Sequence, residues 1–368
     1  ITIVIIALCV PIILDLFQQA DGVILRGKDD GLVRYSIHAN DKLINTIHSP
    51  AVQSIIDKVV PMLLDSNQVQ PIYDNKNTYP VGATEIKIAW IPTKSVFDPS
   101  KTYNVKAIVN DHKSGEKDYS KAVEEEMTMI GFHLFTVTEQ HPEGVWSTFD
   151  LYDLAPDRET YSKKANVVAP TNGKEYILCS KDGGVENGIE QDLSDSTPYV
   201  AMSVFQSHPA GVRYDDKHSA MIPLSEVDST FLMQLDSSNA IVKAALKGNV
   251  WSNYKLVGSI WSKTNEDIDN LLHGALNVEN GVSTKNRQGQ KTVGKSFGSL
   301  NNSNVALETT FQANGLNCFT CHSMNNNLYR KSNFKGENVP NINLKSPLVT
   351  SHLMEKFVEV KAYMTYVE

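Results

Sequence analysis

Residues 127–138 read Met-Thr-Met-Ile-Gly-Phe-His-Leu-Phe-Thr-Val-Thr, and this stretch decides the fold. Successive side chains of a β-strand point to opposite faces of its sheet. His133, Phe135 and Val137 therefore share one face, while Phe132 and the residues two positions from it share the other. A strand with apolar side chains on both faces is typical of the centre of a sheet. We expect this stretch to be the central strand of a β-rich body.

The chain turns back directly after this strand. The sequence His141-Pro142-Glu143-Gly144 contains the Pro and Gly that favour a tight turn, and residues 145–151 follow with strand character. Two strands joined by so short a connection predict a β-hairpin. The acidic residues 116–126, which precede the central strand, are expected to form a solvated surface segment.

The spacing of apolar residues predicts further helices and strands, and the composition of one stretch predicts a linker. Apolar residues recur at helical spacing after Ser49, which predicts a helix over about residues 50–61 that Pro61 kinks or ends. Residues 277–304 are rich in Gly, Asn and Ser and predict a linker. A short helix is expected over residues 305–311, with Ser303 as its N-cap. Further strands are predicted at residues 32–37, 85–90, 103–109, 175–179, 199–205 and 254–261.

These elements predict an α+β fold. Residues 21–300 are expected to form the β-rich body with its N-terminal helix, and residues 301–368 to form a segment of helix and loop packed on that body. Residues 1–20 are expected to be a signal peptide or an N-terminal apolar segment.

The C-terminal segment contains Cys318-Phe319-Thr320-Cys321-His322, a C-x-x-C-H sequence. This is the pattern to which haem is covalently attached in c-type cytochromes. The thiols of Cys318 and Cys321 can add to the two vinyl groups of one porphyrin, and the imidazole of His322 can occupy the fifth coordination site of iron. The pattern therefore predicts one covalent haem c, carried by the C-terminal segment.

Three other interpretations of these cysteines are open. A zinc site needs further soft ligands at short spacing, whereas Cys9 and Cys179 are solitary and distant. A thioredoxin-like redox pair is expected early in a βαβ unit, and this pair lies near the C-terminus. A structural disulfide between Cys318 and Cys321 would give His322 no role. Haem attachment explains all three residues.

Four stretches resemble a family of exported bacterial proteins described as the cytochrome c family. The resemblance covers roughly residues 80–325. It implies a β-rich body with one c-type haem near the C-terminus, and it implies no substrate because that family has no well-defined reaction. The four stretches are Gly82-Ala83-Thr84-Glu85-Ile86-Lys87-Ile88-Ala89-Trp90, Ile130-Gly131-Phe132-His133-Leu134, Val145-Trp146-Ser147-Thr148-Phe149-Asp150, and Leu307-Glu308-Thr309-Thr310-Phe311-Gln312 before Cys318–His322.

The sixth coordination site of the iron has several candidate ligands. His133 is one, because the resemblance includes it and Gly131 leaves room for a flat ring to approach the backbone. Met354, Met129 and His352 are alternatives, and an open site is a further one. A methionine ligand would raise the potential of the iron, whereas a second histidine would leave it lower.

The surroundings of the haem are expected to come partly from the β-rich body. Only 46 residues follow His322, which is short for the remainder of an all-helical cytochrome c domain. Phe311 and Phe319 are therefore candidates for packing against the porphyrin, with general core packing as the alternative role.

Composition and charge limit the partners. The chain has 368 residues, a net charge of −8 and a pI near 5.7, which argues against binding to nucleic acid or to anionic membrane surfaces. A redox protein with a basic docking face is a compatible partner. Ile1–Leu14 carry no charge, are too short to span a membrane, and match the apolar region of a secretory signal. We therefore expect a periplasmic or otherwise extracytoplasmic protein with no stable membrane span.

The expected function is one-electron transfer by a monohaem cytochrome. Two alternatives are a haem enzyme with an open sixth site that acts on a small ligand or peroxide, and a non-haem binding module with a Cys318–Cys321 disulfide. The sequence contains no Ser-His-Asp pattern, P-loop or dinucleotide fingerprint, so no catalytic residue is assigned.

Overall fold

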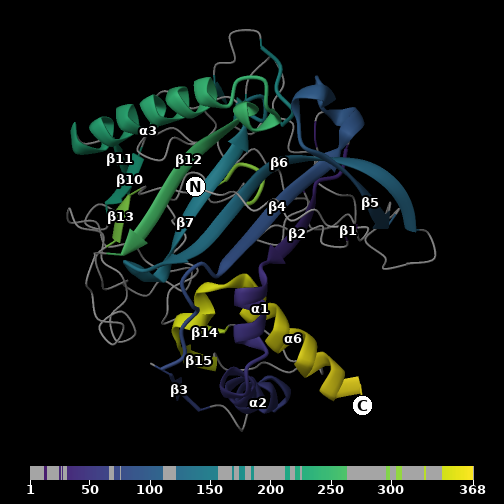
Figure 1. Ribbon diagram of the computed structural model, residues 1–368, viewed down its shortest axis with the longest axis vertical. Helices are drawn as coiled ribbons and strands as arrows, with labels where there is room; N and C mark the ends of the chain where they lie inside the picture. Colours follow the sequence, from purple (N-terminus) through teal and green to yellow (C-terminus); the bar gives the residue numbers. More distant parts are fainter. Residues whose placement is uncertain are drawn as a thin grey trace.

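The chain folds as an α+β protein around a mostly antiparallel sheet (Figure 1). This computed structural model describes residues 12–14, 25, 27, 31–65, 70–74, 76–110, 122–155, 168–169, 174–178, 184–185, 212–215, 220–223, 226–262, 296–298, 304–308, 327–328 and 342–367.

Eight strands of the described residues form the main sheet. Strand β6 is 17 residues long and lies at its centre. β4 pairs along one edge of β6, while β5 and β7 follow one another along the other edge. The strands are β1 (Ile12–Leu14), β2 (Arg34–Ala39), β4 (Thr84–Pro92), β5 (Asn104–Asn110), β6 (Ala122–Thr138), β7 (His141–Leu151), β12 (Tyr254–Ser262) and β13 (Ser296–Gly298).

The predicted central strand is confirmed, and it begins earlier than expected. β6 starts at Ala122, so the end of the acidic segment is an exposed part of this strand instead of a loop. Glu124 in this part forms an ion pair of 3.0 Å with Lys106 of β5. The strands predicted near residues 32–37, 85–90, 103–109 and 254–261 correspond to β2, β4, β5 and β12.

The predicted hairpin is confirmed, but its turn lies two residues earlier than expected. Thr138 pairs with His141, so the turn consists of residues 139–140 and the Pro-Gly sequence belongs to β7. Gly144 has a φ of +88°, and a Cβ there would lie 2.0 Å from Cε2 of Phe135. The glycine therefore serves packing and backbone geometry inside the strand rather than the reversal of the chain.

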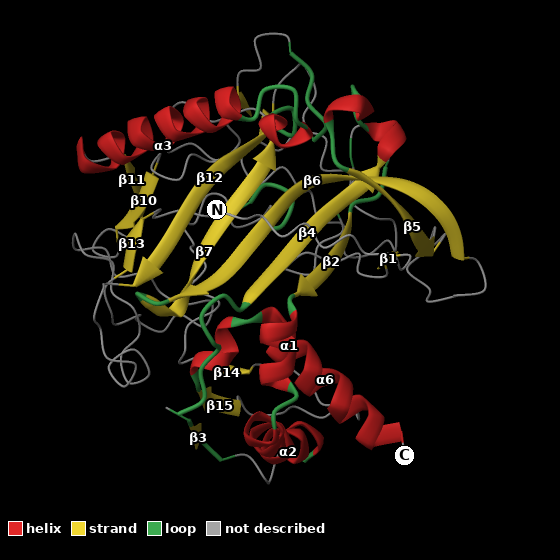
Figure 2. Ribbon diagram, viewed as in Figure 1, coloured by secondary structure: helices red, strands yellow, loops and turns green. Residues whose placement is uncertain are grey.

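Helices from the two halves of the sequence meet at one end of the sheet (Figure 2). Seven apolar residues of α2 are buried, and the side chain of Ser49 accepts a hydrogen bond from Val52 N at the start of the helix. The helix continues through Pro61 to Leu64, so the proline removes one donor near the end without stopping the helix. This end contains α1 (Asp41–Ile47), α2 (Pro50–Leu64), the 3-10 helix η7 (Pro347–Thr350), α6 (His352–Val367) and the small sheet of β3 (Ile72–Tyr73), β14 (Asn327–Leu328) and β15 (Ile342–Lys345).

The remaining described elements are helix α3, three 3-10 helices and two small two-stranded sheets. The predicted strand over residues 175–179 is absent from its described part, which is a single bridge residue followed by a turn. Residues 199–205 lie outside the described residues, and β13 falls within the predicted linker. These elements are β8 (Val168–Ala169), β9 (Gly184–Val185), β10 (Val212–Asp215), β11 (Ala220–Pro223), α3 (Glu226–Ala245, beside β12) and the 3-10 helices η2 (Thr93–Ser95), η3 (Pro99–Lys101) and η5 (Val250–Asn253).

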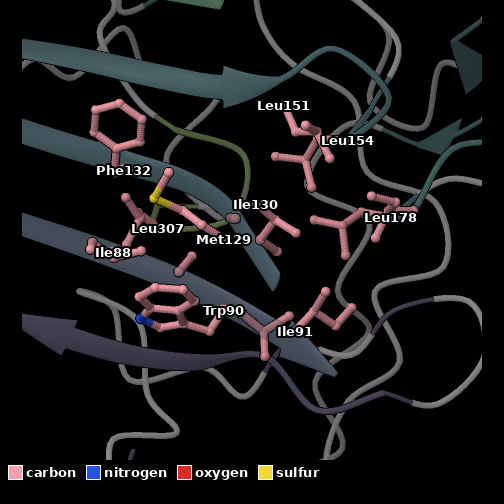
Figure 3. Close-up of a cluster of buried hydrophobic side chains, with 14 of the residues drawn as sticks. Ile88, Trp90, Ile91, Met129, Ile130, Phe132, Leu151, Leu154, Leu178 and Leu307 are labelled. Atoms are coloured by element: carbon pink, nitrogen blue, oxygen red, sulfur yellow. The ribbon is translucent and has the colours of Figure 1, made fainter. Parts of the chain in front are cut away.

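The buried apolar residues form two clusters. The first joins the helical end to the sheet and includes Phe135 and Trp146 together with residues of α2 and α6. The second lies further along the strands, and Figure 3 shows Leu307, from the C-terminal part of the chain, among side chains of β4 and β6. Both clusters therefore bring residues beyond position 300 against the sheet.

Candidate functional site

A row of polar side chains crosses the sheet between the two apolar clusters. Lys87 of β4 pairs with His133 of β6, which pairs with Thr148 of β7. All three are buried. We call Lys87, His133 and Thr148 the polar row.

The neighbouring rows show where the polar row lies. On its helical side, Glu85 pairs with Phe135, which pairs with Trp146. On its other side, Gly131 pairs with Asp150. Because side chains two residues apart share a face, the three rows face the same side of the sheet. Burying charged groups in such a row is costly unless each group has a partner.

The partner of His133 comes from residues 304–308. The Nε2 atom of His133 lies 2.8 Å from both carboxylate oxygens of Glu308. Its Nδ1 atom lies 2.8 Å from the hydroxyl of Thr148. Both ring nitrogens of the predicted iron ligand are therefore held by this chain.

Residues 304–308 form a turn, where the sequence predicts the start of a helix. The side chain of Asn304 accepts a hydrogen bond from Ala306 N and donates to the carbonyl of Phe149 and to Asp150 Oδ1. An asparagine that bonds its own backbone in this way competes with a helix. The turn is fixed further by the hydroxyl of Tyr35, which donates to the carbonyl of Ala306 at 2.8 Å.

Gly131 makes room for this turn. A Cβ at this position would lie 2.9 Å from Asp150 Oδ1 and 3.0 Å from Asn304 Nδ2. The expected space beside His133 is therefore filled by the Asn304 amide rather than left for a flat ring.

The charge of Glu308 is stabilised by its neighbours. Burial raises the pKa of this carboxyl, but the positive charge and hydrogen bond of His133, the charge of Lys87 and the hydrogen bond from Asn304 N outweigh burial and lower it to about 2. Glu308 is thus ionised at neutral pH and accepts a hydrogen from Nε2 of His133 in either protonation state of the ring.

A second pair of carboxylate and histidine lies one row away. Glu85 is only 1% exposed. Its carboxylate accepts hydrogen bonds from His352 N at 3.1 Å and Leu353 N at 3.2 Å, and from the hydroxyl of Ser351. The Nδ1 atom of His352 lies 2.7 Å from Glu85 Oε1. Glu85 therefore caps the N-terminus of α6 and also fixes the imidazole of His352, the first residue of that helix.

The burial of His352 favours the neutral form of its ring. Burial lowers its pKa well below the usual 6.5, and the positive charges of Lys87 and His133 lower it further. Trp146 contacts both histidines edge-on, with ring centroids 5.3 Å from His352 and 6.4 Å from His133. The indole thus borders both carboxylate–histidine pairs.

The residues predicted to attach the haem lie outside the described part of the chain. Cys318, Cys321, His322, Phe311 and Phe319 all lie beyond the described residues, and their roles stay predictions. The segments on either side of them, 304–308 and 342–353, are described and reach the sheet through Glu308 and Glu85.

The two methionine candidates lie in the apolar clusters. Met354 is 1% exposed and belongs to the core beneath the helices, whereas Met129 is 1% exposed and belongs to the second cluster. Within the described residues, no three or more histidine, cysteine, aspartate and glutamate side chains are grouped so that they could hold a metal ion.

Sequence reasoning missed Glu85, Lys87 and Glu308. The alternation of Glu85 and Lys87 with isoleucines is typical of a strand with one face in water, and only the C-terminal segments above them make that face an interior. The one available signal is the resemblance, whose stretches include all three residues.

Imidazoles are ordinary ligands of haem iron, but both ring nitrogens of His133 are already hydrogen-bonded within the chain. Comparison of the chain with protein-family models, curated proteins and solved structures gave no significant match. In the part of the chain that is described, no helix combines the length and the apolar character needed to cross a membrane.

Proposed function

We propose that this chain is a c-type cytochrome. In this proposal, Cys318 and Cys321 hold one haem through two thioether bonds, and His322 binds the iron on one side. The C-x-x-C-H sequence is the observation that carries the proposal. The bound haem would supply one-electron chemistry, and the protein would set its potential and its access to partners.

The positions of the flanking segments support this proposal. Glu308 lies ten residues before Cys318, and its carboxylate is bonded to His133 in the centre of the sheet. β14 begins five residues after His322 and pairs with β15, which leads to η7 and α6. The described segments that precede and follow the C-x-x-C-H sequence thus both pack on the same body. Phe311 and Phe319 are the residues we expect to pack against the porphyrin.

The proposed role is electron transfer outside the cytoplasm. Covalent haem attachment of this type is completed there in bacteria, and the apolar residues 1–14 match a secretory signal. The net charge of −8 favours a redox protein with a basic docking face as the partner.

Haem staining of a variant with both motif cysteines replaced tests this function. The full chain is matured in cells with haem-attachment machinery, and we expect a denaturing gel to show covalent haem in the unsubstituted protein. The double variant Cys318→Ala/Cys321→Ala should lose the stain completely, whereas Cys179→Ala should keep it. A pyridine haemochrome assay should give one haem c per chain.

Three results would separate the alternatives. Staining that persists in the double variant would contradict the attachment site. An unsubstituted protein without any haem absorption would favour the disulfide-containing binding module. A high-spin ferric spectrum with ready cyanide binding would favour a haem enzyme with an open site.

A further inference from the structure

We propose that a hollow between α1, the start of α2 and residues 76–80 is a binding site for a small organic phosphate, and that Lys42 and Lys76 recognise its charge. The hollow lies at the helical end of the molecule, where Figure 1 shows α1 and α2 together. It does not involve the haem-attachment sequence, so this inference stands apart from the proposed function.

The hollow has the size of a small-molecule site and a polar lining. Its volume is about 490 Å³, within the range of about 300–1,000 Å³ that is common for ligand pockets. Every residue that lines it is described, and none of these residues is acidic. The hollow therefore has room for an organic group beside a phosphate. Its polar side chains include those of Lys42, Asn45, Thr46, Ser49, Lys76 and Thr78.

The two charges of the lining are both positive, although the chain carries a net charge of −8. Within the described part of the chain, the ammonium group of Lys76 has no hydrogen-bond or ion-pair partner. The Nζ atom of Lys42 donates to the carbonyl of Val81 at 2.8 Å, which leaves two of its three hydrogens for a ligand. An anion that enters the hollow therefore has no carboxylate to displace from either lysine.

Buried groups fix the wall that residues 76–80 form. The carboxylate of Asp74, a residue that is 8% exposed, accepts a hydrogen bond from Lys76 N at 3.2 Å. The hydroxyl of the buried Tyr79 donates to the carbonyl of Leu348 at 2.9 Å. A wall held in this way needs little ordering when a ligand binds.

The wall formed by α1 is fixed as well. The side-chain oxygen of Asn40 accepts hydrogen bonds from Leu43 N and Thr84 N, both at 3.2 Å, and so joins the start of α1 to β4. Gly82 has a φ of +82°, and a Cβ there would lie 3.1 Å from Nζ of Lys42. The glycine therefore leaves space for the ammonium group of Lys42 beside the backbone.

These donor groups suit a phosphate better than a carboxylate. Lysine binds phosphate as a point charge, whereas arginine is the residue that binds a planar carboxylate through two parallel hydrogen bonds, and no arginine lines the hollow. The hydroxyl of Ser49 accepts from Val52 N, so its hydrogen can be donated to a phosphate oxygen. The amide of Asn45 and the hydroxyl of Thr78 can bind hydroxyl groups of the organic part.

Calorimetric titration of the full chain tests the inference, with glucose 6-phosphate as the probe. We expect saturable binding of one molecule per chain, weaker binding of inorganic phosphate, and no measurable binding of glucose. Lys76→Met should weaken binding about three- to fivefold, and Lys42→Met/Lys76→Met should abolish it. Lys58→Met is the matched control, because it removes the same charge from an exposed position of α2 that does not line the hollow. Its affinity should equal that of the unsubstituted chain.

Three results would overturn the inference. The first is an unsubstituted chain that shows no saturable binding of glucose 6-phosphate. The second is an equal loss of affinity in Lys58→Met and Lys76→Met, which would show attraction to the total charge instead of to the hollow. The third is tighter binding of citrate than of glucose 6-phosphate, which would indicate a carboxylate ligand. None of these results changes the expected covalent haem, whose loss would instead refute the proposed function.

Discussion

At the scale of single residues, buried charge is arranged in matched pairs. His133 faces Glu308, and His352 faces Glu85. Each carboxylate also accepts a backbone hydrogen bond from the C-terminal part of the chain: Glu308 from Asn304 N, and Glu85 from His352 N. A buried charge without a partner costs several kcal/mol, so these pairs fasten the two segments to particular places on the sheet.

The pair of His133 and Glu308 should make stability depend on pH in the acid range. The pKa of Glu308 is about 2 in the fold, below its ordinary value of 4.5. Its ionised form therefore stabilises the fold fully above pH 4.5, and this contribution is lost as the pH falls toward 2. We expect Glu308→Gln to lower the free energy of unfolding at pH 6 by on the order of 2 kcal/mol.

Urea unfolding of Glu308→Gln and the unsubstituted protein at pH 6, 4 and 3 measures this effect. The difference between the two proteins should shrink as the pH falls. Glu124→Gln, which changes an exposed carboxylate of β6, should cost less than about 0.5 kcal/mol at any of these pH values. A deficit for Glu308→Gln that is the same at pH 6 and pH 3 would contradict the assigned ion pair.

At the scale of elements, the local sequence pattern predicts those strands and helices whose buried faces are apolar. Alternation finds β6, and helical spacing finds α2, because their faces are apolar where they are buried. The expected helix over residues 305–311 begins instead as a turn, since Asn304 bonds to the backbone of residue 306 and to β7. The side chain of Asn304 competes with helical hydrogen bonds because it also bonds to Phe149 of β7. The sequence around residue 304 does not reveal this distant partner.

The hairpin of β6 and β7 should be sensitive to one glycine. Gly144→Ala places a methyl group 2.0 Å from the ring of Phe135, on a backbone with φ +88°. We expect a loss of unfolding free energy of about 2–4 kcal/mol, from positive-φ strain together with overpacking.

Gly248→Ala provides the matched control for this prediction. Gly248 has φ +85° but no atom within 4 Å of an added Cβ, so its substitution isolates the backbone strain of about 1–2 kcal/mol. Thermal unfolding followed by circular dichroism compares the two variants. Equal melting temperatures for both would show that the contact with Phe135 has no effect.

At the scale of the whole molecule, long-range contacts place the candidate site, and these are what the sequence cannot give. His133 and Glu308 are 175 residues apart, and Glu85 and His352 are 267 apart. Residues such as Lys87 look like the solvent face of a strand until the C-terminal segments cover them. The C-x-x-C-H sequence can be recognised because its five residues are adjacent, whereas the two carboxylate–histidine pairs join strands β4 and β6 to residues far along the chain.

Peptide mass spectrometry of the full chain tests the central claim most directly. After maturation with haem-attachment machinery, proteolysis should release a peptide containing residues 318–322 that carries the mass of one haem on both cysteines. The same peptide should show no modification when attachment is blocked. A peptide in which Cys318 and Cys321 are joined only by a disulfide, recovered from protein matured under attachment conditions, would contradict the assignment of this chain as a c-type cytochrome.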